Sequence, residues 1–275
     1  MCESGAILEL YAPMPTRGIS KEVREEYKKR RMEHWHDGKL EIHRFSMYGE
    51  GKNPILRALR YVFCWCAQFW KGLCAKDIDL IYLASTPPIQ GMLGGLLKKI
   101  KKVPFVYNLQ DIFPDSLAGT GLAKKDGLLW KIGRVIENFT YRNADKIIVI
   151  SEDFKRNIMA KGVPEQKIVV VYNWVDEEAV KHVSREENKL FDMYGLDRKK
   201  FYITYSGNIG LTQNMDMLLE VAKELETTES EIQFVLIGEG AYKKRVQEII
   251  AEQNIGNVTL LPFQPYEDIS HVFSL

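Results

Sequence analysis

The sequence predicts an α/β protein made of two doubly wound domains, the second of them incomplete. Three observations support this prediction. Short, apolar, β-branched runs alternate with helical stretches through most of the 275 residues. A charged and aperiodic segment, 173–200, interrupts that alternation. The alternation then restarts, gives three more strand-like runs, and stops inside a helix-like segment. We therefore expect one domain over residues 1–172 and a second over 173–275.

The first domain is predicted from six strand-like runs and the helices between them. The later runs are short and almost wholly apolar, which is typical of strands buried on both faces of a parallel sheet. The expected strands are 6–12, 40–47, 79–84, 104–109, 145–150 and 167–172. The expected helices are 53–76, 89–102, 127–143 and 152–161.

The second domain repeats the same βα pattern over a shorter length. Its expected strands are 201–205, 232–237 and 258–261, its helices are 214–226 and 241–253, and 265–275 begins another helix. A doubly wound domain usually has about five or six strands. Three strands therefore indicate that this domain is incomplete.

Charge is distributed unevenly along a chain of ordinary globular composition. The apolar fraction is 45%, and a net charge of +1 gives no case for nucleic-acid binding. Residues 1–102 carry 18 Lys or Arg against 11 Asp or Glu, whereas the remainder carries 20 against 26. The basic first part indicates either attraction to an anionic partner, such as a membrane surface or a phosphorylated substrate, or a solvated basic face.

Cysteine usage and the lack of long apolar segments favour a cytoplasmic protein. The cysteines have no partner cluster, so we expect free thiols in a reducing compartment and no zinc site; they are Cys2, Cys64, Cys66 and Cys74. The opening residues do not resemble a signal peptide, and no segment offers about 18 uninterrupted apolar residues for a membrane span. The five histidines are scattered, with His34 and His36 in a charged loop, and no GxSxG motif supports hydrolase chemistry.

Two glycine-containing loops follow strands of the second domain. One covers residues 206–210 (SGNIG) and the other 238–240 (GEG). Glycine lets a backbone approach a ligand closely, and a following helix offers its positive N-terminus to phosphate. Ligands of open α/β sheets bind at the carboxyl ends of strands. Either loop could also be a plain tight turn, and Lys243, Lys244 and Arg245 could face phosphate or only solvent.

Acidic and hydroxyl side chains follow two strands of the first domain. Asp111 ends a buried strand, where its carboxylate could accept a hydroxyl proton or a hydrogen bond from a substrate. It could instead shape the turn, with Asp115 capping the helix that follows. For Ser85 and Thr86 we favour capping of the next helix over a place in the cleft.

The helix expected at 53–76 has an aromatic centre with basic flanks. The stretch 61–70 (YVFCWCAQFW) is too short to span a bilayer, but it could lie at a membrane interface with Phe63, Trp65, Phe69 and Trp70 at headgroup depth. The basic flanks would favour anionic lipid; they are Arg57, Arg60, Lys71 and Lys76. The alternative is a core helix with one apolar exposed face.

Several segments together resemble glycosyltransferase family 4, particularly the bacterial branch that builds O-antigen, capsule and colanic-acid-type polysaccharides. The resemblance covers nearly the whole chain from about Ala6. The matching text lies at 106–116 (VYNLQDIFPDS), 141–151 (YRNADKIIVIS), 162–176 (GVPEQKIVVVYNWVD), 205–216 (YSGNIGLTQNMD), 237–240 (IGEG) and 257–265 (NVTLLPFQP).

The resemblance implies a GT-B fold, in which two Rossmann-like domains bind a nucleoside diphosphate sugar and transfer the sugar with retention. No metal and no other cofactor is implied. Many members carry Arg where this chain has Asn208 and Lys where it has Gln213, so backbone amides and the basic residues after 240 would balance the diphosphate. The implied donor-binding residues are Ser206, Gly207, Asn208, Gly210, Gln213, Gly238, Glu239, Gly240, Lys243 and Lys244.

On the acceptor side, many members place a His where this chain has Gln110 and Asp111. We therefore expect Asp111 to be the catalytic residue that positions the acceptor, with Gln110 binding substrate. The implied acceptor is a lipid-linked saccharide for lipopolysaccharide or capsule. We expect a cytoplasmic protein that meets this acceptor as a peripheral protein on the inner face of the cell membrane, through 53–76.

The family's first strand is expected before Met1 and its E-x7-E element beyond Leu275, so we expect a fragment, a misassigned reading frame or a decayed copy. We expect the chain as given not to turn over a sugar nucleotide. The leading hypothesis is a hexosyl- or N-acetylhexosaminyltransferase, or part of one. The alternatives are a non-catalytic remnant or partner-binding protein of the same fold, and a sugar-nucleotide epimerase, for which no motif is found.

Overall fold

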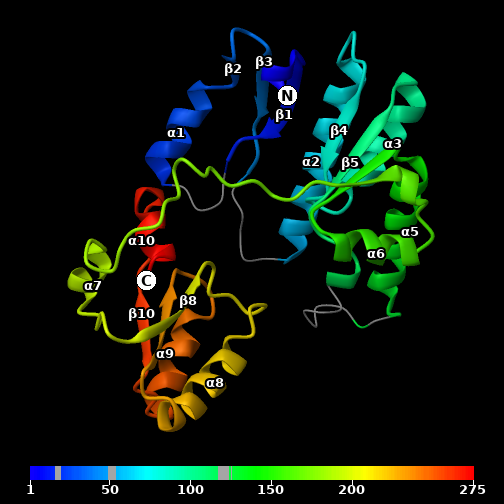
Figure 1. Ribbon diagram of the computed structural model, residues 1–275. Coiled ribbons are helices and arrows are strands. Elements are labelled where there is room, and N and C mark those ends of the chain that lie inside the picture. Colours follow the sequence, from blue (N-terminus) through cyan, green and yellow to red (C-terminus); the bar gives the residue numbers. More distant parts are fainter. Residues whose placement is uncertain (16–19, 49–53, 117–123, 125) are drawn as a thin grey trace. The chain divides into compact units, whose positions relative to one another are not determined.

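A computed structural model describes residues 1–15, 20–48, 54–116, 124 and 126–275, without the side chains of Lys21, Pro54, Ile55, Arg57 and Ala58. The chain divides into two compact units, unit 1 over Met1–Asn173 and unit 2 over Trp174–Leu275. Each unit combines a parallel sheet with helices, which confirms the predicted α/β class (Figure 1). The division falls one residue after the boundary that the sequence predicted.

The main sheet of unit 1 contains four parallel strands in the order β4-β5-β6-β7. The strands are β4 (Ile81–Ala84), β5 (Phe105–Leu109), β6 (Lys146–Val149) and β7 (Ile168–Val170). Phe105 and Ile147 are fully buried, as expected for strands covered on both faces. Each strand lies within a run that the sequence predicted.

Helices connect these strands in sequence order. They are α3 (Gln90–Lys101), α5 (Leu128–Asn143) and α6 (Glu152–Ala160), and a short 3₁₀ helix, η2 (Glu165–Lys167), precedes β7. Crossovers between neighbouring parallel strands are right-handed, so these three helices lie on one face of the sheet. The long helix α2 (Pro54–Cys74) packs beside α3. Its Trp65, Phe69 and Leu73 contact the same core.

A second, mixed sheet lies at the start of unit 1. It contains β1 (Leu8–Pro13), β3 (Leu40–Phe45) and β2 (Met32–Trp35), with β1 parallel and β2 antiparallel to β3. A 3₁₀ helix, η1 (Cys2–Ser4), and α1 (Lys21–Lys29) belong to the same region. The sequence analysis missed α1 and β2, and it placed His34 in a loop although His34 lies in β2. Positive φ angles at Asp37 and Gly38 form the hairpin turn, and this dipeptide was the overlooked signal.

Unit 2 has helices on both faces of a three-stranded parallel sheet. Its strands β8 (Phe201–Ser206), β9 (Ile232–Ile237) and β10 (Val258–Leu261) lie in the order β10-β9-β8. Alternate residues of β9 face different helices. Phe234 and Leu236 pack with α8 (Met215–Thr228) and α9 (Lys243–Glu252), whereas Val235 and Ile237 pack with α7 (Lys189–Tyr194) and α10 (Ile269–Phe273).

The predicted crossing segment is more ordered than its sequence indicates, because it contains α7 and is tied to α10. The fully buried Asn188 donates from Nδ2 to the carbonyl oxygens of His271, at 2.8 Å, and Ser274, at 3.2 Å. A further 3₁₀ helix, η3 (Tyr266–Asp268), leads into α10. Among the described residues, no helix has the length and apolar character needed to cross a bilayer.

Candidate functional site

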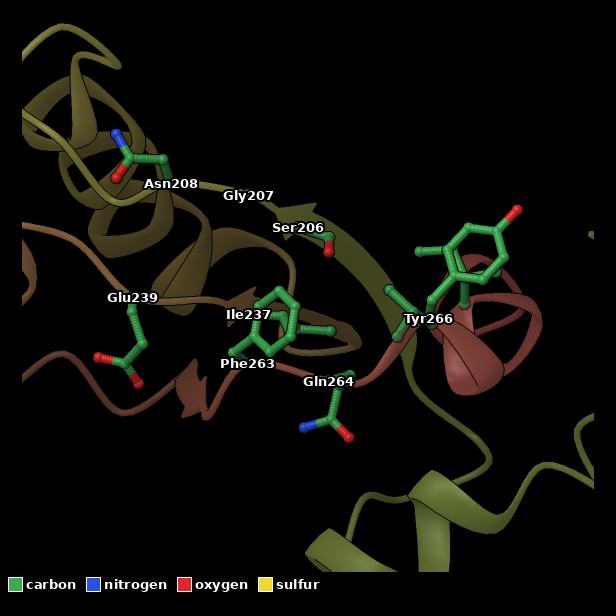
Figure 2. A pocket seen from close by; sticks show the side chains of 10 residues that line it. Ser206, Gly207, Asn208, Ile237, Glu239, Phe263, Gln264 and Tyr266 are labelled. Carbon is green, nitrogen blue, oxygen red and sulfur yellow. The ribbon is translucent and has the colours of Figure 1, made fainter. Parts of the chain in front are cut away.

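Three loops of unit 2 surround a cavity of about 400 Å³ at the carboxyl ends of β8, β9 and β10. Figure 2 shows the side chains that the three loops and α10 contribute. Carboxyl ends of parallel strands are where open α/β sheets bind ligands. The lining residues are Ser206, Gly207, Asn208, Ile237, Glu239, Phe263, Gln264, Tyr266, Ile269 and Val272.

Backbone hydrogen bonds hold the first two loops together. The N–H of Gly207 donates to the carbonyl of Ile237 at 3.0 Å, and the N–H of Ile209 donates to Glu239 at 2.9 Å. Ile209 is fully buried beneath the loops. Its carbonyl in turn accepts from Tyr242 N–H at 3.0 Å. The two loops therefore form one backbone structure over the ends of β8 and β9.

The glycines that this structure requires are those of the second loop. Gly238 has a φ of +144°, and a Cβ there would lie 1.9 Å from the carbonyl oxygen of Gly207. A Cβ at Gly240 would lie 2.0 Å from the carbonyl oxygen of Ile209. At Gly207 the nearest atom would be the Tyr205 hydroxyl, at 3.2 Å. Gly238 and Gly240 therefore allow the backbone of the first loop to approach the second loop closely. The sequence analysis had instead predicted that these glycines contact a ligand.

Two backbone donors of cavity-lining residues on these loops remain available to a ligand. Among the described residues, the N–H groups of Asn208 and Glu239 donate to no protein acceptor, and both residues line the cavity. Gly210, Gly238 and Gly240 belong to the same loops but do not line the cavity, and neither does Gln213. The loop carboxylate, Glu239, is the only charged side chain among the lining residues named above.

The three basic residues predicted to face phosphate occupy different places. Lys243 Nζ pairs with Glu239 at 2.6 Å and donates to the Gly238 carbonyl at 2.9 Å, so it lies against the second loop. Lys244 is exposed and lies 3.9 Å from Glu248. Arg245 pairs with two acids of its own helix, Glu248 and Glu252. Of the three, Lys243 is the cation beside the cavity.

The helix that follows the first loop does not present a purely positive N-terminus. α8 begins at Met215, and Asp216 lies in its first turn. The Tyr242 hydroxyl donates to Asp216 at 2.8 Å. This hydrogen bond to a carboxylate raises the pKa of Tyr242. The end of α8 is therefore less suited to an anion than the free loop amides are.

The sequence analysis quoted the third loop as text that resembles the family but assigned it no site residue. Phe263 and Tyr266 are 72% and 61% exposed, although both line the cavity. Gln264, also at the cavity, donates from Nε2 to the Tyr194 hydroxyl at 2.9 Å. An overlooked signal was the pair Pro262 and Pro265, which closes the strand and starts a loop at the same edge as the two glycine loops.

In unit 1, a buried hydroxyl fixes the turn that carries Asp111. Ser85 Oγ accepts from the backbone N–H groups of Gln110, at 2.9 Å, and Asp111, at 3.2 Å. The prediction that Ser85 or Thr86 caps the next helix is wrong, because the N-cap of α3 is Ile89 and makes no side-chain cap bond. Asp111 itself is exposed and accepts a hydrogen bond from Ser116 at 3.2 Å.

A buried ion network lies beside this turn. Lys161 Nζ pairs with Glu137 at 2.9 Å and with Asp115 at 2.6 Å, and Arg134 also pairs with Glu137. The side chain of Glu137 is 3% exposed. Asp115 therefore joins an ion pair, whereas the sequence suggested a helix cap. No motif in the sequence indicated that Glu137 would be buried.

A cavity of about 10 Å³, large enough for about one water molecule, connects the network with the Asp111 turn. Asp111 and Glu137 both line it, together with Tyr107 and Tyr141. Burial, reinforced by the Glu137 carboxylate, raises the pKa of both tyrosines, which stay protonated donors. The described residues contain no group of three or more His, Cys, Asp or Glu side chains that could hold a metal ion.

The aromatic residues of α2 that were predicted to face lipid lie on two different faces of the helix, one exposed and one packed against the core. Phe63 and Trp70 are 51% and 67% exposed. Trp65 and Phe69 pack against the core of unit 1, so the prediction that they face lipid is wrong. The side chain of Arg57 lies outside the described part of the chain.

Comparison with known proteins identifies both units. A family model described as "Glycosyl transferase 4-like domain" matches residues 6–174, and one described as "Glycosyl transferases group 1" matches residues 186–275. The chain is 27% identical over 175 residues to "Putative colanic acid biosynthesis glycosyl transferase WcaI" of Escherichia coli (strain K12), covering 62% of this chain and 42% of that protein. It is 25% identical over 174 residues to "Probable glycosyltransferase WbjE" of Pseudomonas aeruginosa, covering 63% and 43%. The chain thus spans less than half the length of these curated relatives.

Solved structures share the fold. The structure of Anabaena Alr3699/HepE in complex with UDP and glucose matches with a TM-score of 0.62 at 18% identity, covering 97% of this chain and 71% of that one. Sucrose-phosphate synthase from Thermosynechococcus elongatus matches with a TM-score of 0.68 at 14% identity, covering 99% and 64%. Because the first family model covers more than half of the residues, the chain belongs to the glycosyl transferase 4-like family of GT-B glycosyltransferases.

Proposed function

We propose that the whole protein transfers a sugar from a nucleoside diphosphate sugar, and that the donor diphosphate binds in the cavity of unit 2. The observation that carries this proposal is the pair of unpaired N–H groups at Asn208 and Glu239, on adjacent loops that line one cavity. Backbone donors at strand ends are suited to phosphate oxygens. Stabilising the leaving diphosphate would then supply most of the catalysis.

The comparisons support the same class of donor. The Anabaena structures of the same fold are described as complexes with UDP, with UDP and glucose, and with UDP-glucose. In this chain, Phe263 and Tyr266 add exposed aromatic faces beside the two loops, suited to a planar base or a sugar ring. Lys243 would balance diphosphate charge after exchanging its contact with Glu239 for the ligand.

For the acceptor we propose a lipid-linked saccharide that Asp111 positions. The Ser85 hydroxyl fixes the backbone of this turn, and the Asp111 carboxylate is exposed. The Escherichia coli relative is named for colanic acid biosynthesis, which supports an acceptor in polysaccharide assembly. We further propose a cytoplasmic protein that meets its acceptor at the membrane, with the exposed Phe63 and Trp70 of α2 contacting lipid.

A non-catalytic protein of the same fold is the competing function. It is favoured by one observation: among the lining residues of the cavity there is no Lys or Arg to meet a diphosphate. The two functions predict different affinities of the cavity for a nucleoside diphosphate. A donor site must bind this ligand even where no sugar transfer follows, whereas a non-catalytic protein of the same fold need not bind it.

Titration calorimetry with UDP tests the donor site. We expect Asn208→Arg to tighten UDP binding about tenfold, since an added cation at the loop gains a charge-assisted hydrogen bond. Gly207→Val should weaken binding and leave the fold intact, because Gly207 lines the cavity and its Cβ would meet only the Tyr205 side chain. Gln253→Arg is the matched control, because it adds the same charge at an exposed position of unit 2. UDP affinity that is equal in all three variants and the parent chain would refute the site.

A further inference from the structure

Three neighbouring helices of unit 1 have an unusual charge composition. α2, α3 and α5 together contain nine Lys or Arg residues and one acid, Glu137. That acid is buried and pairs with Arg134, one of the nine, and Lys98 pairs with Asp145, so neither pair adds net charge to the surface. The nine basic residues are Arg57, Arg60, Lys71, Lys98, Lys99, Lys101, Lys131, Arg134 and Arg142. By contrast, α8 of unit 2 contains four acids and one Lys.

The three helices form one layer. α3 packs against α2 on one side and α5 on the other. The crossovers through α3 and α5 lie on the same face of the sheet, and α2 packs against the same core. The outward surfaces of the three helices therefore belong to one side of unit 1, with the lysines of α3 between the other two helices.

The outward face of α5 is apolar. Leu128, Ile132 and Val135 are 76%, 49% and 69% exposed, and their spacing of four and three residues places them on one side of a helix. The opposite side carries the buried Gly133, Glu137 and Thr140. Exposed Leu129 widens the stripe. The sequence analysis treated this segment only as a crossover helix.

The outward face of α2 has the same character. Leu59, Phe63 and Trp70 are each more than half exposed and recur at helical spacing, and the exposed Cys66 lies between them. Lys71 follows next to the stripe. Two apolar stripes thus flank α3, whose exposed Lys99 lies over the ring of Phe139 at 5.0 Å.

We infer that the α2–α3–α5 layer docks on an anionic lipid surface, with α2 and α5 as two apolar anchors and the basic residues between and beside them meeting headgroups. Apolar helix faces with basic flanks bind such interfaces, each cation adding attraction. A second copy of the chain is a poorer occupant, because two layers of net positive charge would repel each other. The inference rests on the proposed acceptor class for its purpose, but the binding itself does not require it.

Vesicle sedimentation of the whole chain tests the layer. The vesicles are phosphatidylcholine alone or phosphatidylcholine mixed with phosphatidylglycerol, at low and high salt. We expect binding only to the anionic vesicles, weakened by salt. Val135→Glu on α5 and Phe63→Glu on α2 should each lower the partition coefficient at least about tenfold, and Lys131→Gln about fivefold. Met217→Glu, the same kind of change at a 56% exposed position of α8, should have no effect.

Each other outcome overturns part or all of the inference. Equal binding to both vesicle types would refute the role of charge. Loss with Phe63→Glu but not with Val135→Glu would refute the second anchor. Failure to bind anionic vesicles, or dimerisation that Val135→Glu abolishes in light scattering, would refute lipid as the occupant. UDP titration of the same samples separates the two proposals, because UDP binding without lipid binding contradicts only this inference. Circular dichroism confirms that each variant is folded.

Discussion

The two units place their candidate site residues by different means. In unit 2, backbone contacts join the loops after β8 and β9, and Gly238 and Gly240 permit an approach that any Cβ would block. In unit 1, side chains hold the turn after β5 in place, through the Ser85 hydroxyl and the ion network of Lys161 with Glu137. Both arrangements lie at the carboxyl ends of parallel strands, but different substitutions should disrupt them. The backbone contacts of unit 2 should be disrupted by an added side chain, whereas the side-chain contacts of unit 1 should be disrupted by loss of a hydrogen bond or a charge.

The largest expected effect comes from adding a side chain where unit 2 has none. Gly238→Val would place a Cβ 1.9 Å from the Gly207 carbonyl oxygen at a φ of +144°. We expect unit 2 to lose about 3 to 5 kcal/mol of stability. Hydrogen exchange measured on peptides of β8 and β9 reports on that unit alone.

Gly207→Val is the matched control for this change. Its Cβ would meet only the Tyr205 hydroxyl, at 3.2 Å, so protection of β8 and β9 should stay close to that of the parent chain. Equal exchange rates in the two variants would show that the loops can separate freely, and the comparison between backbone and side-chain devices would fail.

The next effect comes from breaking the ion network of unit 1. Lys161→Met removes the cation shared by Glu137 and Asp115 and leaves a buried carboxylate with Arg134 as its remaining partner. We expect a loss of about 3 kcal/mol. Lys155→Met, on α6, which Lys161 follows directly, breaks only a pair with the exposed Glu165 and should cost much less. Urea unfolding of both variants checks the difference, and similar losses would contradict the special role of Lys161.

The sequence predicted the fold more fully than it predicted the sites, and the comparison explains why. Buried strands such as β5 and β9 are continuous apolar runs, so their position and type follow from local composition. The glycine loops were found because glycine at a strand end is a local signal. Which glycines are obligatory depends on contacts between the loops, and a single loop's sequence cannot show them.

The sequence analysis also did not predict contacts between side chains that are far apart in the sequence. Lys161 and Glu137 are 24 residues apart, and both look like ordinary charged positions on amphipathic helices. The helix at 127–143 was predicted, but not the exposure of its Leu128 and Val135, because helical spacing alone does not distinguish a face packed on the core from one left exposed. These features depend on which elements become neighbours.

The smallest expected effect concerns a carboxylate device that both units share. Asp145 accepts from Lys98 Nζ at 2.7 Å and from the Phe105 N–H at 2.8 Å. In unit 2, Glu226 accepts from Lys223 Nζ and the Gly256 N–H, both at 2.8 Å. Partial burial alone would raise the pKa of Asp145, but these hydrogen bonds hold it below its ordinary value. The Lys223 and Gly256 hydrogen bonds likewise lower the pKa of Glu226.

A depressed carboxyl pKa stabilises the fold at neutral pH, because the folded state binds its proton less readily than the unfolded chain does. That stability is fully present above the unfolded pKa of about 4 and is lost as the pH falls through the folded value. Asp145→Asn should therefore lower stability at pH 7, and its difference from the parent chain should shrink below about pH 4. Glu226→Gln should show the same trend in unit 2. Hydrogen exchange of β5 and β10 across this range assigns each effect to its unit. A deficit for Asp145→Asn that persists undiminished at pH 3 would show that the side chain acts through packing and not through its charge.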